Sequence, residues 1–313
     1  GTPVTTLPFP GASPYPRSLT LWEPGAAPRS CVVLSHGMAE HIARYEALGK
    51  YLAARGYLVC GYNHLGHGAE APRKGFFADD KGWDKLLLDL DSVIRFLAGR
   101  HPGVPLVLLG NSMGSFLARE YALRYPERLS ALVLSGTGYY PPPLCRLGQA
   151  LAGLHCAFGQ GEKEAGLIHQ LAFAGNNKPF TPAATPNDWL SRDAAEVQLY
   201  EKDPLCGFVF TARGYQDLFG GLMKLTRFQR LKALPQALPV LLISGAEDPV
   251  GGQGKGVEAV AGQHREAGLS HVQVRLYPGA RHELFHEINR EDVFADLARW
   301  LDQALPQGKE NNA

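Results

Sequence analysis

The sequence carries almost no net charge, because its 31 Lys and Arg residues are balanced by 30 Asp and Glu residues. A nucleic-acid-binding protein needs a concentrated basic surface, and a protein held at a membrane by electrostatics needs a polybasic cluster. The balance of charge weighs against both classes. Charged residues are 19% and hydrophobic residues 45% of the chain, which is typical of a globular protein rather than of a disordered one.

Paired cysteine motifs and long apolar runs are also missing. The five cysteines are odd in number and form no Cys-x-x-Cys pair, so neither a disulfide framework nor a zinc knuckle is expected. No apolar run reaches the roughly 18–20 residues that a bilayer span requires. Residues 1–16 show neither the basic region nor the apolar core of a signal peptide. We therefore expect a cytoplasmic protein without a transmembrane segment, and leave open whether a leader precedes Gly1.

Short aliphatic and β-branched runs alternate with helical patterns over residues 31–136. The apolar runs predict strands at residues 19–22, 31–34, 57–60, 105–109, 129–134, 239–243 and 272–276. The helical patterns predict helices at residues 41–55, 83–98, 115–124 and 292–304, and Gly56 is expected to end the first of them. This alternation favours an α/β protein in which helices cover both faces of a mostly parallel sheet.

The alternation stops between residues 139 and 234, where Pro and Gly interrupt short amphipathic stretches and no buried strand is evident. The simplest interpretation is one sheet interrupted by an inserted, mostly helical unit. The predicted division is a first core part at residues 1–138, an inserted cap at 139–234 and a second core part at 235–313.

The pentapeptide at residues 110–114, Gly-Asn-Ser-Met-Gly, matches the Gly-x-Ser-x-Gly pattern of a nucleophilic serine. A predicted strand precedes it and a predicted helix follows it, as this motif requires. Gly110 and Gly114 allow a tight turn that lifts the Ser112 hydroxyl off the sheet, and the following helix places free N–H groups beside it. An ordinary glycine-rich turn is the alternative.

A serine hydroxyl needs a base that removes its proton, and the imidazole of that base needs an orienting carboxylate. His282 follows the strand predicted at residues 272–276, and Asp248 follows the strand predicted at 239–243. Glu247 is the alternative acid. The chain order Ser, Asp, His is that of one triad fold and differs from the order in two others. All three candidates follow strands, where an open parallel sheet builds its site.

Acyl transfer also needs donors for the oxyanion. We expect one donor to be the backbone N–H of Met113, the residue after the nucleophile. The other is expected to be the N–H of Met38, which lies in the loop His36-Gly37-Met38 after an early predicted strand.

Five segments of the chain carry distinctive motifs, at residues 35–45, 64–68, 110–114, 245–250 and 279–283. Together these segments resemble the α/β-hydrolase superfamily, and within it the monoacylglycerol lipase and lysophospholipase group of serine-aminopeptidase-like hydrolases. The resemblance covers residues 19–304. Asn63 departs from the Asp that is frequent there in this group, at a position that stabilises a turn.

The resemblance implies the α/β-hydrolase fold with Ser112 as nucleophile, His282 as base and Asp248 as acid, and the Met38 and Met113 amides as oxyanion hole. It also implies that the insertion is a cap over an acyl pocket. Aromatic residues of this insertion are candidates to line that pocket, although packing in the core would also account for each. The candidates are Tyr139, Tyr140 and Phe208.

His282-Glu283-Leu284-Phe285-His286 also matches the His-Glu-x-x-His pattern of zinc proteases, which places two histidines on one helix. Here the first histidine follows a Pro-Gly loop, and no further ligand stands out. A zinc hydrolase is therefore the remote alternative. No metal and no organic cofactor is expected.

The sequence thus predicts a serine carboxylic-ester hydrolase for small-molecule esters with one acyl chain, such as monoacylglycerols or lysophospholipids. An amidase, peptidase or thioesterase with the same triad is the alternative. The cap is expected to permit transient membrane contact, and the activity is expected to fall below about pH 6–7. The oligomeric state and the chain length of the acyl group are left open.

Overall fold

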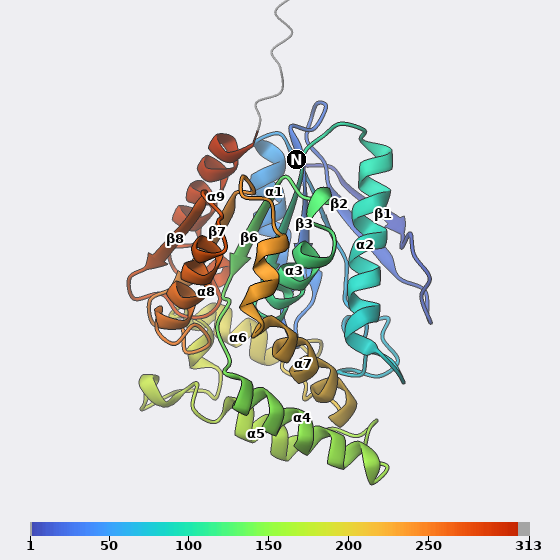
Figure 1. Ribbon diagram of the computed structural model, residues 1–313, viewed down its shortest axis with the longest axis vertical. Coiled ribbons are helices and arrows are strands. Elements are labelled where there is room, and N and C mark those ends of the chain that lie inside the picture. Colours follow the sequence, from blue (N-terminus) through green and yellow to red (C-terminus); the bar gives the residue numbers. More distant parts are fainter. Residues whose placement is uncertain (1, 306–313) are drawn as a thin grey trace, which may run out of the picture.

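The computed structural model describes residues 2–305, whose strands form an eight-stranded sheet in the order β1-β2-β4-β3-β5-β6-β7-β8 (Figure 1). The strands are β1 (Val4–Pro8), β2 (Ser18–Trp22), β3 (Ser30–Ser35), β4 (Tyr57–Gly61), β5 (Leu106–Asn111), β6 (Ala131–Ser135), β7 (Val240–Gly245) and β8 (Val272–Tyr277). β1 and β2 run antiparallel to their neighbours, whereas β3 to β8 are parallel.

Helices cover both faces of the sheet. The covering helices are α1 (Glu46–Ala54), α2 (Gly82–Arg100), α3 (Met113–Arg124), α8 (Lys255–Glu266) and α9 (Arg290–Ala304). Side chains alternate between the two faces of a strand, and in β3 Val32 and Leu34 pack with α1 and α9, whereas Cys31 and Val33 pack with α2, α3 and α8. Two apolar cores therefore hold the sheet between them, and the predicted α/β architecture is confirmed.

The helix predicted at residues 41–55 begins with one 3-10 turn, η1 (Ile42–Tyr45), and continues as α1. Gly56 follows it with φ +94°, and its N–H donates to the Ala53 carbonyl oxygen, as expected for a residue that ends a helix. Among the described residues, no helix is both long and apolar enough to cross a bilayer.

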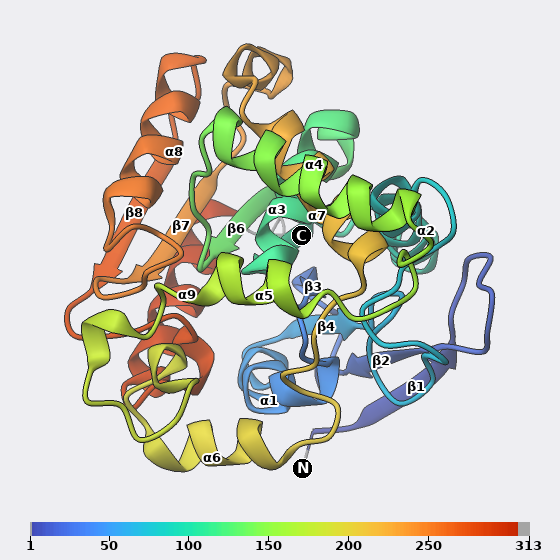
Figure 2. The ribbon, with the colours of Figure 1, turned by 90° about the horizontal axis from the view of Figure 1, so that it is seen from below.

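The segment between β6 and β7 is mostly helical and lies toward the lower end of the molecule in Figure 1, so that it faces the viewer in Figure 2. Its helices are α4 (Pro142–Ala157), α5 (Gly166–Phe173), α6 (Ala194–Lys202) and α7 (Ala212–Leu225), and its 3-10 turns are η3 (Lys178–Phe180), η4 (Asp188–Leu190) and η5 (Phe228–Ala233). α4 packs along α7, which in turn contacts α2 and α3. The residues of this segment, all of which the structure describes, contain no strand of the sheet.

The carboxyl ends of β5, β7 and β8 meet at one edge of the sheet, because these strands are parallel. Ser112 follows β5, Asp248 follows β7, and His282 follows β8. The fold therefore places these three side chains at the edge where open parallel sheets build their sites.

Candidate active site

Ser112 stands at a strained turn between β5 and α3. Its backbone has φ +55° and ψ −120°, and its N–H donates to the Ser135 carbonyl oxygen at 2.8 Å. A side chain on Gly110 would collide with the carbonyl group of Gly114, and one on Gly114 would collide with that of Ser35. Both glycines of the motif are therefore required by close backbone approach.

Ser112, His282 and Asp248 form one hydrogen-bonded chain. The Ser112 hydroxyl lies 2.9 Å from Nε2 of His282, and Nδ1 of His282 lies 2.8 Å from Oδ2 of Asp248. Asp248 is fully buried, and its Oδ1 accepts the N–H of Val250 at 2.9 Å. The carboxylate fixes the proton of the ring on Nδ1 and leaves Nε2 free to accept from the serine. Glu247 is exposed.

The inserted segment holds the His282 loop in place. The Trp189 ring packs against the His282 ring, with 5.0 Å between centroids, and the Trp189 carbonyl oxygen accepts the His282 N–H. The next N–H, that of Glu283, donates to the Leu190 carbonyl oxygen at 2.7 Å. Gly136 also leaves room for the ring, since a Cβ there would stand 3.2 Å from Cε1 of His282.

Two opposing effects act on the pKa of His282. Burial of the ring favours its neutral form and lowers the pKa, whereas the adjacent Asp248 carboxylate favours the cation and raises it. The carboxylate, helped by Glu283 and Glu40, outweighs burial, so the pKa lies above its ordinary value of 6.5. This is the direction expected of a base that accepts a proton beside a buried acid.

The loop after β3 lies against Ser112. A Cβ on Gly37 would stand 3.2 Å from the Ser112 Cβ, so the next residue, Met38, is close to the serine. Met113 is the first residue of α3, where backbone N–H groups have no partner within the helix. Within residues 2–305, neither the Met38 nor the Met113 N–H donates to a protein group, so both are available to a ligand.

The Glu40 side chain holds the loop after β3 through several hydrogen bonds. Its Oε2 accepts the N–H of Gly37 at 2.6 Å and the hydroxyl of Tyr45 at 2.7 Å, and its Oε1 pairs with Arg44 at 2.7 Å. Burial would raise the pKa of Glu40, but Arg44 and the other neighbours lower it to about 2. The sequence pattern alone assigns no role to Glu40 or Arg44, although both lie in the segment 35–45 that carries the resemblance.

Residues 282–286, which match the zinc-protease pattern, do not form the helix that this pattern requires. Residues 284–286 make a single 3-10 turn, η6 (Leu284–His286), and Glu283 precedes that turn. Glu283 is bound by the Arg44 guanidinium at 2.7 Å, and His282 is occupied by the serine and the aspartate. The two histidines therefore do not share the helix face that the zinc-protease arrangement requires.

The three aromatic residues proposed for a pocket have other neighbours. Tyr139 is 37% exposed and stacks on Phe228. Tyr140 packs edge-on against Phe116, and Phe208 packs against His67. Burial, together with the Asp248 charge, raises the pKa of Tyr140. Their role in a pocket stays a prediction.

A hollow of about 690 Å³ lies elsewhere, between the loop that joins β1 to β2 and helix α2. Tyr15, Leu65, Phe77 and Leu88 are among its lining residues, and no member of the hydrogen-bonded chain is. We therefore do not assign this hollow to the chemistry of Ser112.

Comparison with known proteins gives the same picture over nearly the whole chain. Residues 26–289 match the family described as serine aminopeptidase, S33. A monoacylglycerol lipase of Mycolicibacterium smegmatis is 30% identical, over 90% of this chain and 91% of that protein. The human monoglyceride lipase is 28% identical, over 90% and 85% of the two chains. A thermostable carboxyl esterase from Bacillus coagulans, solved with glycerol, superposes with a TM-score of 0.89 at 25% identity and covers 97% of this chain and 99% of its own.

Proposed function

This chain belongs to the serine aminopeptidase S33 family, and from that premise we propose that it hydrolyses single-acyl-chain lipid esters, of the monoacylglycerol or lysophospholipid class, through an acyl-enzyme. The chain has the α/β-hydrolase fold and is an ester-hydrolysing enzyme, as its relatives and structural neighbours indicate. The hydrogen-bonded chain of Ser112, His282 and Asp248 is the observation that carries the proposed mechanism.

In the first half of the proposed reaction, the Ser112 oxygen attacks the ester carbonyl while His282 accepts its proton at Nε2. The N–H groups of Met38 and Met113 stabilise the resulting oxyanion, and Asp248 stabilises the imidazolium. His282 then gives the proton to the departing alcohol, which leaves an ester between Ser112 and the acyl chain. Water attacks this ester in the second half, with His282 again as base, and releases the fatty acid and the free serine.

The inserted segment, residues 139–234, serves as the cap in this proposal. Trp189 packs against the ring of His282 from this segment, so the cap stands at the reacting serine and shapes what reaches it. The apolar Trp189 ring beside His282 suits the binding of an acyl chain. Tyr140 and Phe208 remain candidates to line the acyl pocket.

A matched substrate series tests the substrate class. The purified protein is given monoacylglycerols of increasing chain length, together with the thioester and the amide of the best acyl chain. We expect a chain-length optimum and faster turnover of the ester than of the amide or the thioester. A preference for the amide would favour the amidase or peptidase alternative, and a preference for the thioester would favour a thioesterase.

Ester hydrolysis is expected to fall on the acid side with a midpoint above pH 6.5. Only neutral His282 can accept the serine proton, and the Asp248 carboxylate raises its pKa above the ordinary value of 6.5. Lowering the pH through that pKa protonates the base and stops the reaction. The measurement is kcat/KM from about pH 5 to pH 9 on a substrate that does not ionise there. A midpoint below pH 6.5 would contradict the proposed control by the carboxylate.

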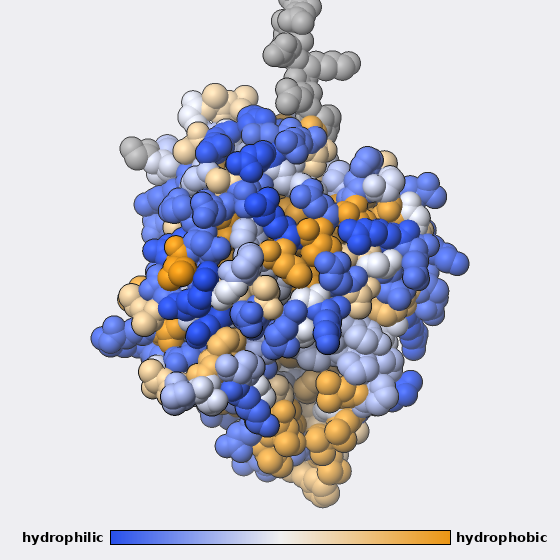
Figure 3. Space-filling model, turned by 90° about the vertical axis from the view of Figure 1, so that its left-hand side faces the viewer, coloured by the Kyte–Doolittle hydropathy of each residue, from blue (hydrophilic) through white to orange (hydrophobic). Residues whose placement is uncertain are grey.

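Apolar side chains gather on the outer face of the cap. Figure 3 shows them as an orange area at the end of the molecule where α4 and α5 lie. The exposed large apolar residues here are Leu144, Leu147 and Leu154 of α4, Phe158 directly after α4, and Leu167 and Leu171 of α5. On α4 they recur at helical spacing and so form one face. A lipid surface is the proposed partner, because the substrates are esters of lipids and an apolar helix face binds the membrane interface. The expected cytoplasmic location stays a prediction.

The double variant Leu147→Asp/Phe158→Asp is expected to lower binding to phosphatidylcholine vesicles by about tenfold or more, because it removes two apolar contacts and places charge at the interface. Co-sedimentation at constant lipid gives the bound fraction. Leu88→Asp is the control, since Leu88 is 57% exposed but lies on α2. Equal vesicle binding of the double variant and the control would contradict the proposal that this apolar face contacts the membrane.

A further inference from the structure

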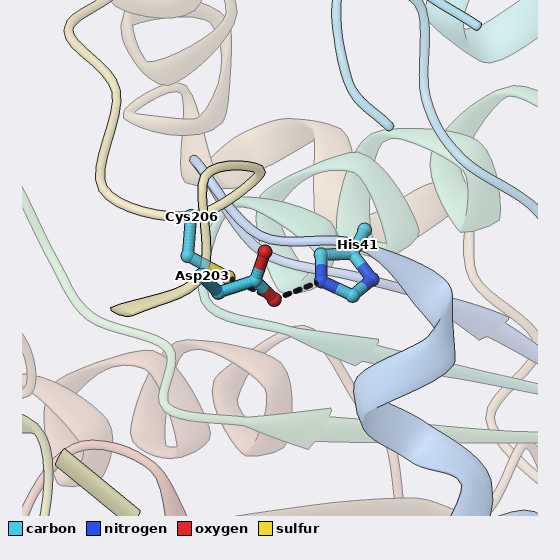
Figure 4. A group of neighbouring side chains, drawn as sticks. All are labelled: His41, Asp203 and Cys206. Carbon is cyan, nitrogen blue, oxygen red and sulfur yellow. Dashed lines mark hydrogen bonds and ion pairs between the residues drawn. The ribbon is translucent and has the colours of Figure 1, made fainter. Parts of the chain in front are cut away.

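Three side chains of types that can bind a metal, from two distant parts of the chain, converge beside the loop after β3 that carries Met38, residues 36–41, which is called here the oxyanion loop (Figure 4). His41 lies at the end of that loop, and Asp203 and Cys206 lie just after α6 in the cap. Nε2 of His41 is 2.6 Å from Oδ2 of Asp203, and the Cys206 sulfur is 3.5 Å from the same oxygen. All three ligand atoms lie within 4.8 Å of one another.

The donor set is one imidazole nitrogen, one carboxylate oxygen and one sulfur, a combination that favours Zn²⁺ over Mg²⁺ or Ca²⁺. With bonds of about 2.0–2.3 Å, neighbouring ligands of tetrahedral zinc stand about 3.3–3.7 Å apart. The sulfur and Oδ2 already have this spacing. The nitrogen and Oδ2 need to move apart by about 0.7 Å, which is within reach of side-chain rotation.

The surrounding backbone holds these ligands in place. Oδ1 of Asp203 accepts the N–H of Leu205 at 2.9 Å, which turns Oδ2 toward His41 and Cys206. The Cys206 N–H donates to the Asp203 carbonyl oxygen, and the Gly207 N–H donates to the Ala39 carbonyl oxygen at 2.9 Å. The last bond joins the cap directly to the oxyanion loop. Backbone hydrogen bonds therefore hold the three side chains close together, in addition to the contacts between the side chains themselves.

Charge and access also suit a divalent ion. A thiolate and a carboxylate together balance its two charges, and metal binding displaces the thiol proton. The side chains of His41 and Asp203 are 12% and 26% exposed, so the site can be reached from solvent and a water molecule can complete four-fold coordination.

A second cluster of metal-binding side-chain types differs, because a protein cation is already bound in it. Glu40, Glu283 and His286 also lie within ligand distance of one another. The guanidinium of Arg44 is already bound there, at 2.7 Å from both Glu40 and Glu283, and supplies the positive charge. Within residues 2–305, the Asp203 carboxylate pairs with His41, and no Lys or Arg side chain forms an ion pair with it.

We propose that His41, Asp203 and Cys206 form a zinc-class metal site that fastens the cap to the oxyanion loop. The site is separate from the hydrolytic chain of Ser112, and its existence does not depend on the proposed reaction. Because metal binds these ligands together only in the folded protein, it stabilises the chain against unfolding.

Metal binding to full-length, chelator-stripped protein tests the site directly. Zn²⁺ is titrated in competition with a chromophoric chelator, and Co²⁺ is added to report the ligands by absorption. We expect one equivalent of Zn²⁺, a thiolate-to-cobalt charge-transfer band, and a rise in Tm of about 2–6 °C with excess Zn²⁺. Cys206→Ser and His41→Gln are expected to weaken binding at least about tenfold, and Cys206→Ser also to abolish the charge-transfer band.

Cys156→Ser is the matched control, since Cys156 is another partly buried cysteine of the cap and lies outside the cluster. The proposal predicts that this variant keeps both the affinity and the cobalt band of the parent protein. Unchanged Zn²⁺ affinity in Cys206→Ser and His41→Gln, or a cobalt band that is lost in Cys156→Ser instead, would overturn the assignment. None of these readouts uses ester hydrolysis, so failure of the metal site and failure of the proposed function are distinguishable.

Discussion

Ser112→Ala is expected to lower kcat for a monoacylglycerol by about 10³–10⁶-fold, because it removes the oxygen that we propose forms the acyl-enzyme. The remaining rate would come from substrate binding and the oxyanion donors alone. Initial rates on the parent protein and the variant give the ratio, and a fluorophosphonate probe reports covalent labelling of the serine. The variant should not be labelled.

Ser115→Ala is the matched control for this loss. Ser115 is one helical turn from Ser112, and its hydroxyl donates to the Ser112 carbonyl oxygen at 2.6 Å rather than to His282. We expect this control to keep its labelling and most of its turnover. Near-parental turnover or labelling in Ser112→Ala would instead show that another group is the nucleophile.

Asp248→Asn is expected to cost about 10⁴-fold in kcat, although the side chain keeps its shape. The Asn amide group can donate a hydrogen bond to Nδ1, which favours the tautomer that carries its proton on Nε2 and cannot accept from Ser112. The buried negative charge that stabilises the imidazolium is also lost. The pH dependence gives a second readout, because the residual activity should have a lower acid midpoint without this charge.

Glu247→Gln separates the two acids that the sequence offers. Glu247 is exposed, whereas Asp248 is fully buried and bonded to His282. We therefore expect kinetics close to those of the parent protein from Glu247→Gln. A severe effect in this variant together with a mild effect in Asp248→Asn would reverse the assignment of the acid.

The residues of the hydrogen-bonded chain could be found in the sequence because each follows a recognisable strand. Parallel strands present their carboxyl ends at one edge of the sheet, so local patterns at Ser112, Asp248 and His282 imply that these residues are neighbours in space. Gly110 and Gly114 could be found for a similar reason, since a tight turn from strand to helix restricts both of them locally.

The charged residues around the chain could not be found in this way. Arg44 and Glu283 are 239 positions apart, and nothing within either local segment shows that they form an ion pair. The meeting of His41 with Asp203 and Cys206 likewise depends on how the cap folds back onto the core. Such contacts follow from the path of a long insertion, which neither hydrophobic periodicity nor turn residues determine.

Two core elements were missed for different reasons. β1 is an exposed edge strand that ends at Pro8, so it shows neither a buried apolar run nor a clean strand end. α8 carries a usable signal, since Val257, Val260, Ala261 and His264 are buried at helical spacing. The glycine-rich stretch that precedes α8 obscures its start.

The contacts between the insertion and the His282 loop bear on how this enzyme could be engineered. Besides the two backbone bonds at Trp189 and Leu190, the Asp188 carbonyl oxygen accepts from the Arg281 guanidinium at 2.7 Å. A chimera that received the insertion of another family member would have to keep these three hydrogen bonds, or His282, the proposed base, would lose its alignment. Transplants that leave residues 188–190 untouched are therefore the ones that should retain turnover.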